Sequence, residues 1–485
     1  MSLYSLSFPR LSLSLIYRYC CLVVWLQLGN LISDDTLHAQ NNGIPLPPSP
    51  PVQYQRPKTL QYTNMVYKDD IRSVIFAISD QNLLRELSDP IIPLNGRLQL
   101  SLSFDEMGSI AQNYSYTVEH CTHDWQPSDL NTFDYIEGFT RNDITDYRYS
   151  FALTQPYVHY RLELPNSDLR LTKSGNYLLK IYANDSPDQL VLTRRFVVYE
   201  SHVAAAVTIR PATAAPFFRS HQRLEFRLNI DDWNVSNPID QLNVSVLQNG
   251  RWDNAVIGLK PTFINARELV YSPDLQTTFA AGNEFRFADL RTVRSCGARV
   301  ARIDRSDAQI DAYIAIDNTQ HSETKRFHLY STDLNGKYFI GINDGSFYNR
   351  LDADYLKAHF TLPMPQPFPN AKVYLFGALS DWDIRPEFEV PYNPKMGAYE
   401  AAIWLKQGFY DYQYALVADM PDSGMPQRPY INTDLTEGNY FATENVYYIL
   451  TYFRAYDILD YDRVIGFKCV NSGMGTLFDI NYRCD

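Results

Sequence analysis

The chain has 485 residues, of which 45% are hydrophobic, and a formal net charge of −12. This length is enough for several domains, each with a core of its own. The acidic balance argues against a nucleic-acid binder held by charge, which needs a basic face, and against adhesion to an anionic membrane surface. Aromatic residues make up 14% of the chain, mostly as 36 tyrosines and 26 phenylalanines, and such residues favour strands.

The N-terminus has the features of an export signal. Two arginines and an apolar stretch over residues 20–32 precede Ala39, a small residue suited to a cleavage site. The apolar stretch is shorter than the ~20 residues that span a bilayer. The sequence therefore predicts a signal peptide over residues 1–39 and an exported chain without a membrane anchor. Residues 40–59 are rich in proline, which predicts an extended tether.

Four cysteines remain after the predicted cleavage: Cys121, Cys296, Cys469 and Cys484. An oxidising compartment permits disulfides between them, and the last two are close enough in sequence to close a small loop. The chain contains no CxxC pattern, so a structural zinc site has no support. We expect neither a metal nor another cofactor.

Most of the remaining chain predicts strands. Residues 97–104, 223–230 and 398–405 alternate between apolar and polar side chains, which is the period of a strand with one buried face. The Asn-Gly pairs at 249–250 and 335–336 suit type I′ hairpin turns, and Asp344-Gly345 is a third candidate. Short strands at this spacing predict an all-β fold of tandem β-sandwich, immunoglobulin-like domains.

Changes in composition near residues 200 and 361, where prolines gather, suggest the domain boundaries. We predict three β-domains over residues 60–200, 201–360 and 361–485. Residues 446–453 are apolar on both strand faces, which predicts either a central strand covered on both sides or a face that docks to a partner.

The segment EHCTHDW, residues 119–125, has the residue types of a metal or catalytic site. Strand alternation separates them, however. His120 shares a face with the preceding apolar residues, whereas Glu119, Cys121 and His123 take the other face. This spacing matches no standard ligand set, so we interpret the segment as a strand end with a structural role.

Acidic residues follow this segment, and they could serve a glycosidase pair or a calcium loop. They are Asp124, Asp129, Asp134, Glu137, Asp143 and Asp146. Their spacing lacks the D-x-D-x-D-G order of a calcium loop, and capping and turn roles suit them better. A secreted enzyme that uses this run is the third functional reading, although the chain contains no P-loop, dinucleotide fingerprint, HExxH or GxSxG motif.

Residues 373–416 resemble the early-set immunoglobulin-like domains that accompany glycogen-active enzymes. The resemblance rests on "VYLFG", on Trp382 after the following loop, and on the segments "GAYEAAIWL" and "GFYDYQYAL". It implies that Trp382 could stack on a sugar ring, although this side chain could equally fill the sandwich edge. Tyr410, Tyr412 and Tyr414 share one strand face and could form core or platform. An α-glucan-binding protein is therefore the alternative function.

A longer series of motifs resembles the plug proteins of the bacterial type IX secretion system. In order, the chain contains "HCTHDWQPSDL", "YIEGF", "ITDYRYSF", "PYVHY", "LPNSDL" and "TKSGNYLLKIY", then "VLQNGRWDNAVIGLKP", "GNEFRF" and "YDRVIGF". The resemblance extends over roughly residues 70–475.

The resemblance implies a non-enzymatic periplasmic protein, peripheral to the outer membrane. Its partner would be the large translocon barrel of the SprA/Sov type, whose channel it would close from the periplasmic side. It implies no nucleic acid, no direct membrane insertion and no catalytic residue, and we expect a monomer. As binding residues we select the aromatic side chains Trp125, Tyr135 and Phe139 of the matching segment, with Trp382 for the alternative function.

Overall fold

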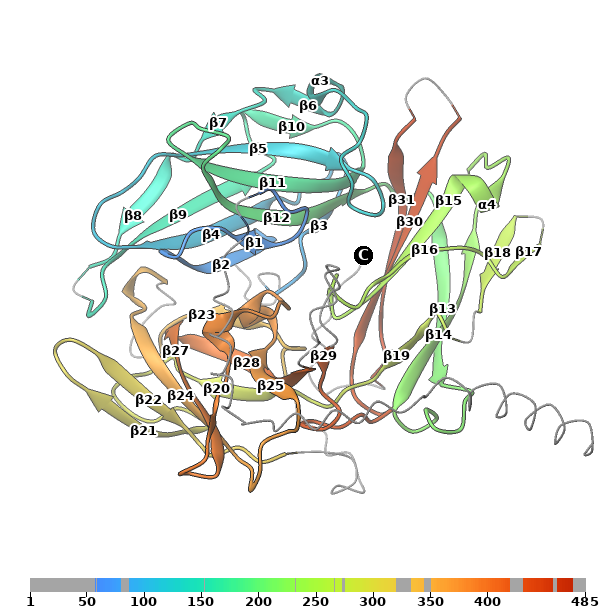
Figure 1. Cartoon of the computed structure of the whole chain (residues 1–485). Helices are drawn as coiled ribbons and strands as arrows, with labels where there is room; N and C mark the ends of the chain where they lie inside the picture. Colours follow the sequence, from blue (N-terminus) through green and yellow to red (C-terminus); the bar gives the residue numbers. More distant parts are fainter. Residues whose placement is uncertain are drawn as a thin grey trace, which may run out of the picture. The chain divides into compact units, whose positions relative to one another are not determined.

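The computed structural model describes most of the chain after residue 56. It describes residues 57, 59–79, 87–151, 153–231, 233–265, 267–272, 275–319, 333–343, 350–418, 431–456 and 460–473. The predicted signal peptide and nearly all of the predicted tether lie outside these residues. The α-helices within the described ranges are α3 (Thr132–Tyr135) and α4 (Pro238–Gln241), and strands dominate the rest, which confirms the all-β sandwich fold (Figure 1).

The first sandwich packs two antiparallel-rich sheets around one apolar core. Its first sheet has the order β1 (Met65–Val66), β12 (Leu190–Tyr199), β11 (Gly175–Ala183), β5 (Tyr114–Cys121), β7 (Asn142–Asp143), with β3 (Ile91–Pro93) also beside β12. Its second sheet has the order β2 (Ile71–Ile78), β4 (Leu100–Met107), β9 (Tyr157–Leu164), β8 (Asp146–Tyr149), and a small ribbon joins β6 (Ile136–Gly138) to β10 (Leu169–Leu171). The predicted alternation of residues 97–104 is confirmed, since Leu100, Leu102 and Phe104 are fully buried in this core.

The second sandwich combines strands from two distant parts of the chain. One sheet has the order β13 (Ala204–Pro211), β14 (His221–Asn229), β18 (Glu268–Tyr271), β17 (Phe263–Asn265), with β19 (Thr278–Ala280) also beside β14. The other has the order β16 (Val256–Leu259), β15 (Leu242–Gln248), β30 (Val446–Arg454), β31 (Asp462–Asn471). Leu224, Phe226 and Leu228 of β14 fill the core, as the alternation of residues 223–230 predicts.

The third sandwich lies in sequence between β19 and β30. One sheet is built on β28 (Gly408–Ala418), which pairs with β20 (Arg286–Asp289), β23 (Tyr338–Ile340), β25 (Ala371–Phe376) and β29 (Ile431–Asn432). The other has the order β21 (Val300–Arg305), β22 (Ile310–Ile314), β24 (Tyr355–Pro363), β27 (Ala398–Lys406), β26 (Tyr392–Asn393). Short 3₁₀ helices η1 (Arg350–Asp352), η2 (Ala378–Ser380) and η3 (Pro386–Phe388) lie in its connections.

These strand pairings group the chain differently from the predicted ranges 201–360 and 361–485. The last two strands, β30 and β31, complete the sheet that β15 begins, and Figure 1 shows them beside it. Conversely, β20 pairs with β28 and thus joins the third sandwich. The third sandwich is therefore an insertion into the second, which composition alone does not show.

Strand β30 is covered on both faces, which confirms the first of the two predicted arrangements. Tyr447 and Ile449 face the core of the second sandwich, whereas Tyr448 and Leu450 belong to a separate cluster. That cluster includes Trp125 and other residues of the first sandwich. The apolar outer face therefore packs against another part of the same chain.

Two of the predicted hairpin turns are confirmed. Asn249 and Gly250 have φ angles of 54° and 71°, and Asn335 and Gly336 have φ angles of 53° and 78°. Positive φ at both central residues is the signature of a type I′ turn. The third candidate, Asp344-Gly345, lies outside the described residues.

The cysteines have three different states. Cys121 is buried and free, Cys296 is exposed and free, and Cys469 is disulfide-bonded. Cys484 lies outside the described residues, so its pairing with Cys469 stays a prediction.

Candidate functional site

The EHCTHDW segment is the end of β5 and the turn after it. His120 is buried, its Nε2 lies 3.2 Å from the carbonyl oxygen of Ser174, and burial lowers its pKa to about 4. Cys121 faces the other way, into the cluster around Trp125. His123 Nδ1 lies 2.9 Å from Asp462 Oδ2 on β31. The three side chains therefore have separate surroundings, as the alternation of residues 119–125 predicts.

Trp125, the first of the predicted binding residues, is 2% exposed. Its ring meets the ring of Trp252 edge-on at 4.8 Å between centroids, and the guanidinium of Arg195 lies 4.3 Å from the centroid of the Trp125 ring. Thr122 Oγ1 accepts a hydrogen bond from the Gln126 backbone N–H and closes the turn that carries the ring. Trp125 thus anchors the first sandwich to the second and does not present its ring to a partner.

Of the other two predicted binding residues, one is buried and one is exposed. Tyr135 is 4% exposed, and its hydroxyl donates to the Val118 carbonyl oxygen. Phe139 is 69% exposed and lies just after β6. Only Phe139 is therefore available at the surface.

Phe139 is one of several large aromatic side chains at the surface of the connection between β5 and β9. We call them the aromatic surface, a set defined by this connection and by exposure: Phe133, Phe139, Tyr147, Tyr149 and Phe151, which are 80%, 69%, 45%, 55% and 83% exposed. Strand β8, which carries the two tyrosines, is an edge strand, so its side chains lack a neighbouring strand on one side. The sequence contains a signal for part of this surface, because Tyr147, Tyr149 and Phe151 follow one another at strand period.

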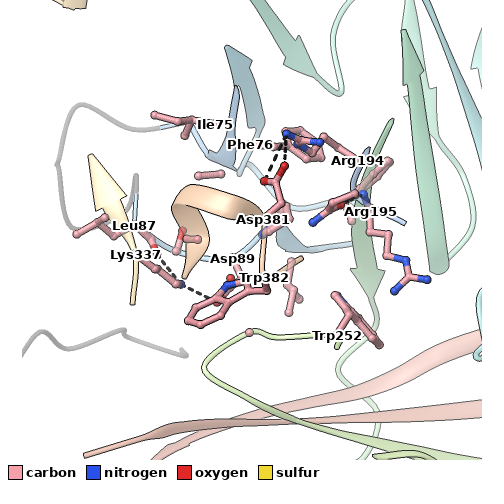
Figure 2. Close-up of a pocket in the computed structure, with 18 of the residues that line it drawn as sticks. Ile75, Phe76, Leu87, Asp89, Arg194, Arg195, Trp252, Lys337, Asp381 and Trp382 are labelled. Atoms are coloured by element: carbon pink, nitrogen blue, oxygen red, sulfur yellow. Dashed lines mark hydrogen bonds and ion pairs between the residues drawn. The ribbon is translucent and has the colours of Figure 1, made fainter. Parts of the chain in front are cut away.

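A cavity of about 140 Å³ lies where all three sandwiches meet. Figure 2 shows its lining, to which the first sandwich contributes Arg194 and Asp89, the second Trp252, and the third Lys337 and Trp382. Lys337 Nζ lies 2.8 Å from Asp89 Oδ2, and the Tyr448 hydroxyl donates to the same carboxylate oxygen. Asp89 thus links the three sandwiches through charge-assisted hydrogen bonds.

Two arginines share one carboxylate beside this cavity. Arg194 on β12 and Arg385 both bind Asp381, at 3.1 Å and 2.5 Å between nitrogen and oxygen. Burial by itself raises the pKa of Asp381, but the two guanidinium groups outweigh it, and the pKa lies below its usual value. The carboxylate therefore stays charged and joins the first sandwich to the third.

Trp382, the residue predicted for sugar stacking, is half-buried at the cavity. The Arg251 guanidinium lies 4.5 Å from its ring centroid, and Phe285 and Phe376 meet it edge-on. A Cβ on Gly336 would lie 2.3 Å from the indole, so only glycine fits there. One face of the ring is therefore covered by Arg251 and is not a free platform for a sugar. Tyr410, Tyr412 and Tyr414, the other aromatic candidates, are core residues.

A deeply buried ion pair joins the first sandwich to the third. Asp105 on β4 and Lys406 on β27 form an ion pair at 2.6 Å, and both side chains are 1% exposed. His159 and Tyr355 complete the hydrogen bonding of the carboxylate. Burial raises the pKa of Asp105, but Lys406 and His159 outweigh this and hold it below its usual value.

Comparisons with known proteins agree with the series of motifs. Residues 71–200 match the type 9 secretion system plug protein 1st domain. A hypothetical protein from Parabacteroides merdae, known from a crystal structure, is 32% identical, covers 85% of this chain and 100% of its own, and has a TM-score of 0.78. The chain is thus similar to the plug proteins over residues 71–200, and to the Parabacteroides merdae protein over most of its length. No curated protein matches it.

The plug-domain match coincides with the first sandwich and contains the whole aromatic surface. Of the predicted binding residues, Trp125, Tyr135 and Phe139 lie inside the match and Trp382 lies outside it. In the described part of the chain, no helix has the length and apolarity needed to cross a membrane.

Proposed function

We propose that the chain is a non-enzymatic periplasmic plug of the type IX secretion system. In this role it is exported by its signal peptide, binds the outer-membrane translocon barrel from the periplasmic side as a monomer, and closes the channel. The match of residues 71–200 to the plug domain supports a role in this secretion system. The aromatic surface supports a docking role for the same domain.

The composition of the aromatic surface suits a contact that forms and breaks. Exposed phenylalanines and tyrosines are enriched at protein interfaces, because they bury much area for few rotatable bonds. Charged side chains interrupt them, including Arg141, Asp143, Asp146 and Arg148. A mixed aromatic and polar surface stays hydrated when it is free, which a fully apolar one does not.

The contacts between the sandwiches support the occlusion of a channel. A plug must keep its form without a ligand, and buried pairs join each sandwich to its neighbours. Lys406 and Asp105 join the third to the first, and the Tyr452 hydroxyl donates to Asn176 Oδ1 between the second and the first. Such buried, hydrogen-bonded contacts resist relative motion of the parts.

The test is recovery of the barrel with affinity-tagged mature protein from gently solubilised outer membranes. We expect the wild type to recover a very large barrel protein and the double variant Phe139→Ser/Phe151→Ser to recover much less. The matched control is Phe263→Ser, since Phe263 is 66% exposed but lies on β17, outside the matched domain. All three proteins should unfold at the same temperature.

Two outcomes would contradict the proposal. One is that the wild type recovers no barrel protein. The other is that the barrel is recovered equally well with the double variant and with the control, because the aromatic surface would then carry no part of the contact.

A further inference from the structure

Strand β13 is an open edge of the second sandwich. It pairs with β14 over its whole length, from Ala204 opposite Asn229 to Pro211 opposite Gln222, without a register shift. No described strand pairs with its other side. The chain just before β13 is paired, because the Val203 backbone N–H donates to the Ile465 carbonyl oxygen on β31.

The hydrogen-bond pattern shows which backbone groups point to the open side. The Ala212 N–H donates to the His221 carbonyl oxygen. In an antiparallel pair the bonded positions alternate, so every second residue before Ala212 is bonded to β14. The N–H and C=O groups of Ala205, Val207 and Ile209 therefore point away from β14. The missing N–H of Pro211 ends this row, and the contact of Val203 with β31 begins it.

No described strand pairs beside the side chains of the same three residues. Ala205, Val207 and Ile209 pack against the core of the second sandwich but remain partly exposed. Their partners directly opposite on β14 are buried to 2% exposure or less: Leu228, Phe226 and Leu224. On the core face of this sheet, the side chains of β14 are thus fully buried, whereas those of the edge strand β13 are partly exposed.

Edge strands in proteins normally carry a feature that prevents pairing with another chain, such as a bulge, an inward charge or shortness. The other described edge strands of eight or more residues, β2 and β31, both have register shifts in their pairing. Edge strand β21 has six residues, a register shift and several charged side chains. Within the described residues, β13 is the long edge strand without a shift.

We propose that the β13 edge binds an extended strand of a partner protein by β-sheet addition. Only another backbone can pair with the row of N–H and C=O groups from Ala205 to Ile209, which excludes a helix or a lipid surface as the occupant. Alternate apolar side chains on the added strand would cover Val207 and Ile209. Near the Pro211 end, Arg210 and Arg223 share the Glu225 carboxylate at 3.3 Å and 2.6 Å, and Arg210 remains 60% exposed. Two guanidinium groups on one carboxylate leave a net positive charge, so an acidic side chain suits that end. This surface lies outside the matched plug domain and is independent of the proposed plug function.

The test uses the full mature chain and a fluorescein-labelled peptide of alternating valine and threonine, about seven residues long, with a glutamate at one end. We expect saturable binding by fluorescence anisotropy, and protection of residues 204–211 from amide hydrogen exchange when the peptide is bound. Val207→Pro removes an N–H from the open side only and should weaken binding about tenfold, whereas Val207→Thr keeps that N–H and should bind like the wild type.

A second arm leaves the protein unchanged and covers the case in which Val207→Pro does not fold. The same peptide, N-methylated at alternate positions on the edge that pairs with β13, should lose binding, because the methyl groups block backbone pairing. Equal binding of both peptides, or no binding of either, would overturn the proposal. Protection of residues 204–211 from amide hydrogen exchange without the peptide would also overturn the proposal. The edge would then be occupied by this chain itself, within a monomer or between the copies of a dimer.

Discussion

Lys406 Nζ lies 2.6 Å from Asp105 Oδ2, and the two residues are 301 positions apart in the sequence. The Lys406 ammonium also lies 3.9 Å from the ring centroid of Tyr157 on the first sandwich. The pair is therefore placed entirely by the packing of the third sandwich against the first, and its charges are removed from water.

Removal of one member of this pair should be costly. Lys406→Met leaves the Asp105 carboxylate buried with less compensation, and we expect the free energy of unfolding to fall by about 3–5 kcal/mol. The double variant Asp105→Asn/Lys406→Met should lose less than the sum of the single changes. Denaturant unfolding of the four proteins measures this, and additive losses would show that the two side chains do not interact.

Trp125 should matter for stability more than for partner binding. Trp125→Ala removes a buried ring between Trp252 and Arg195, and we expect a loss of about 3–5 kcal/mol. Trp404, which is 37% exposed, is the control, and Trp404→Ala should cost clearly less than Trp125→Ala, because less of its ring is buried. Thermal unfolding followed by circular dichroism distinguishes them, and similar losses in both variants would contradict the anchoring role.

The hydroxyl of Tyr452 should stabilise the contact between the second and first sandwiches. Tyr452→Phe removes its hydrogen bond to Asn176 and leaves that buried oxygen without its donor, at a cost of about 1–3 kcal/mol. Tyr456 is 69% exposed, so Tyr456→Phe should leave the unfolding midpoint unchanged. A midpoint for Tyr452→Phe equal to the wild type would show that water replaces the lost contact.

His120 should make the fold sensitive to mild acid. Its folded pKa of about 4 lies below the ordinary value of 6.5, so the unfolded chain binds the proton first as the pH falls. Stability from this group is complete above pH 6.5 and is lost as the pH falls towards 4, by on the order of 3 kcal/mol. His120→Gln cannot titrate, so its unfolding temperature should fall less between pH 7 and 4. Parallel curves for both proteins would contradict the assignment.

Asp462 acts in a lower pH range. The pKa of its carboxyl is about 2, because hydrogen bonds from His123 and Arg454 outweigh the effect of burial. Its contribution is present above the ordinary value of 3.8 and is lost as the pH falls through that value towards 2. Asp462→Asn should therefore be less stable than the wild type at pH 6, and the difference should shrink at pH 2. A constant difference would show that the charge of Asp462 has no role.

Local patterns in the sequence predicted local structure well. Strand period gave the buried face of β14 and the separation of His120 from Cys121, because both follow from backbone geometry within a few residues. The Asn-Gly turns at 249–250 and 335–336 followed for the same reason.

Long-range pairing was not predictable in this way. Nothing near Tyr447 shows that its hydroxyl donates to Gln222, which is 225 residues away, and so the insertion of the third sandwich was missed. The exposure of the predicted binding residues also depends on long-range packing. Trp125 and Phe139 are both aromatic residues of one matching segment, but Trp125 is buried among residues distant in sequence, including Arg195 and Trp252. Phe139, by contrast, is 69% exposed.

The insertion has a consequence for how the polypeptide acquires its structure. Synthesis and export both deliver the chain from its N-terminus, so the first sandwich has all its described strands after residue 199, whereas β15 has no β30 to pair with until residues 446–454 arrive. Until then one edge of β15 has no partner strand. Pairing of strands so far apart in the sequence is slow, because a long loop must close first. Newly made chains thus pass through a long interval in which the second sandwich is open, and loss of the final forty or so residues by premature termination would leave it unfinished rather than merely shortened.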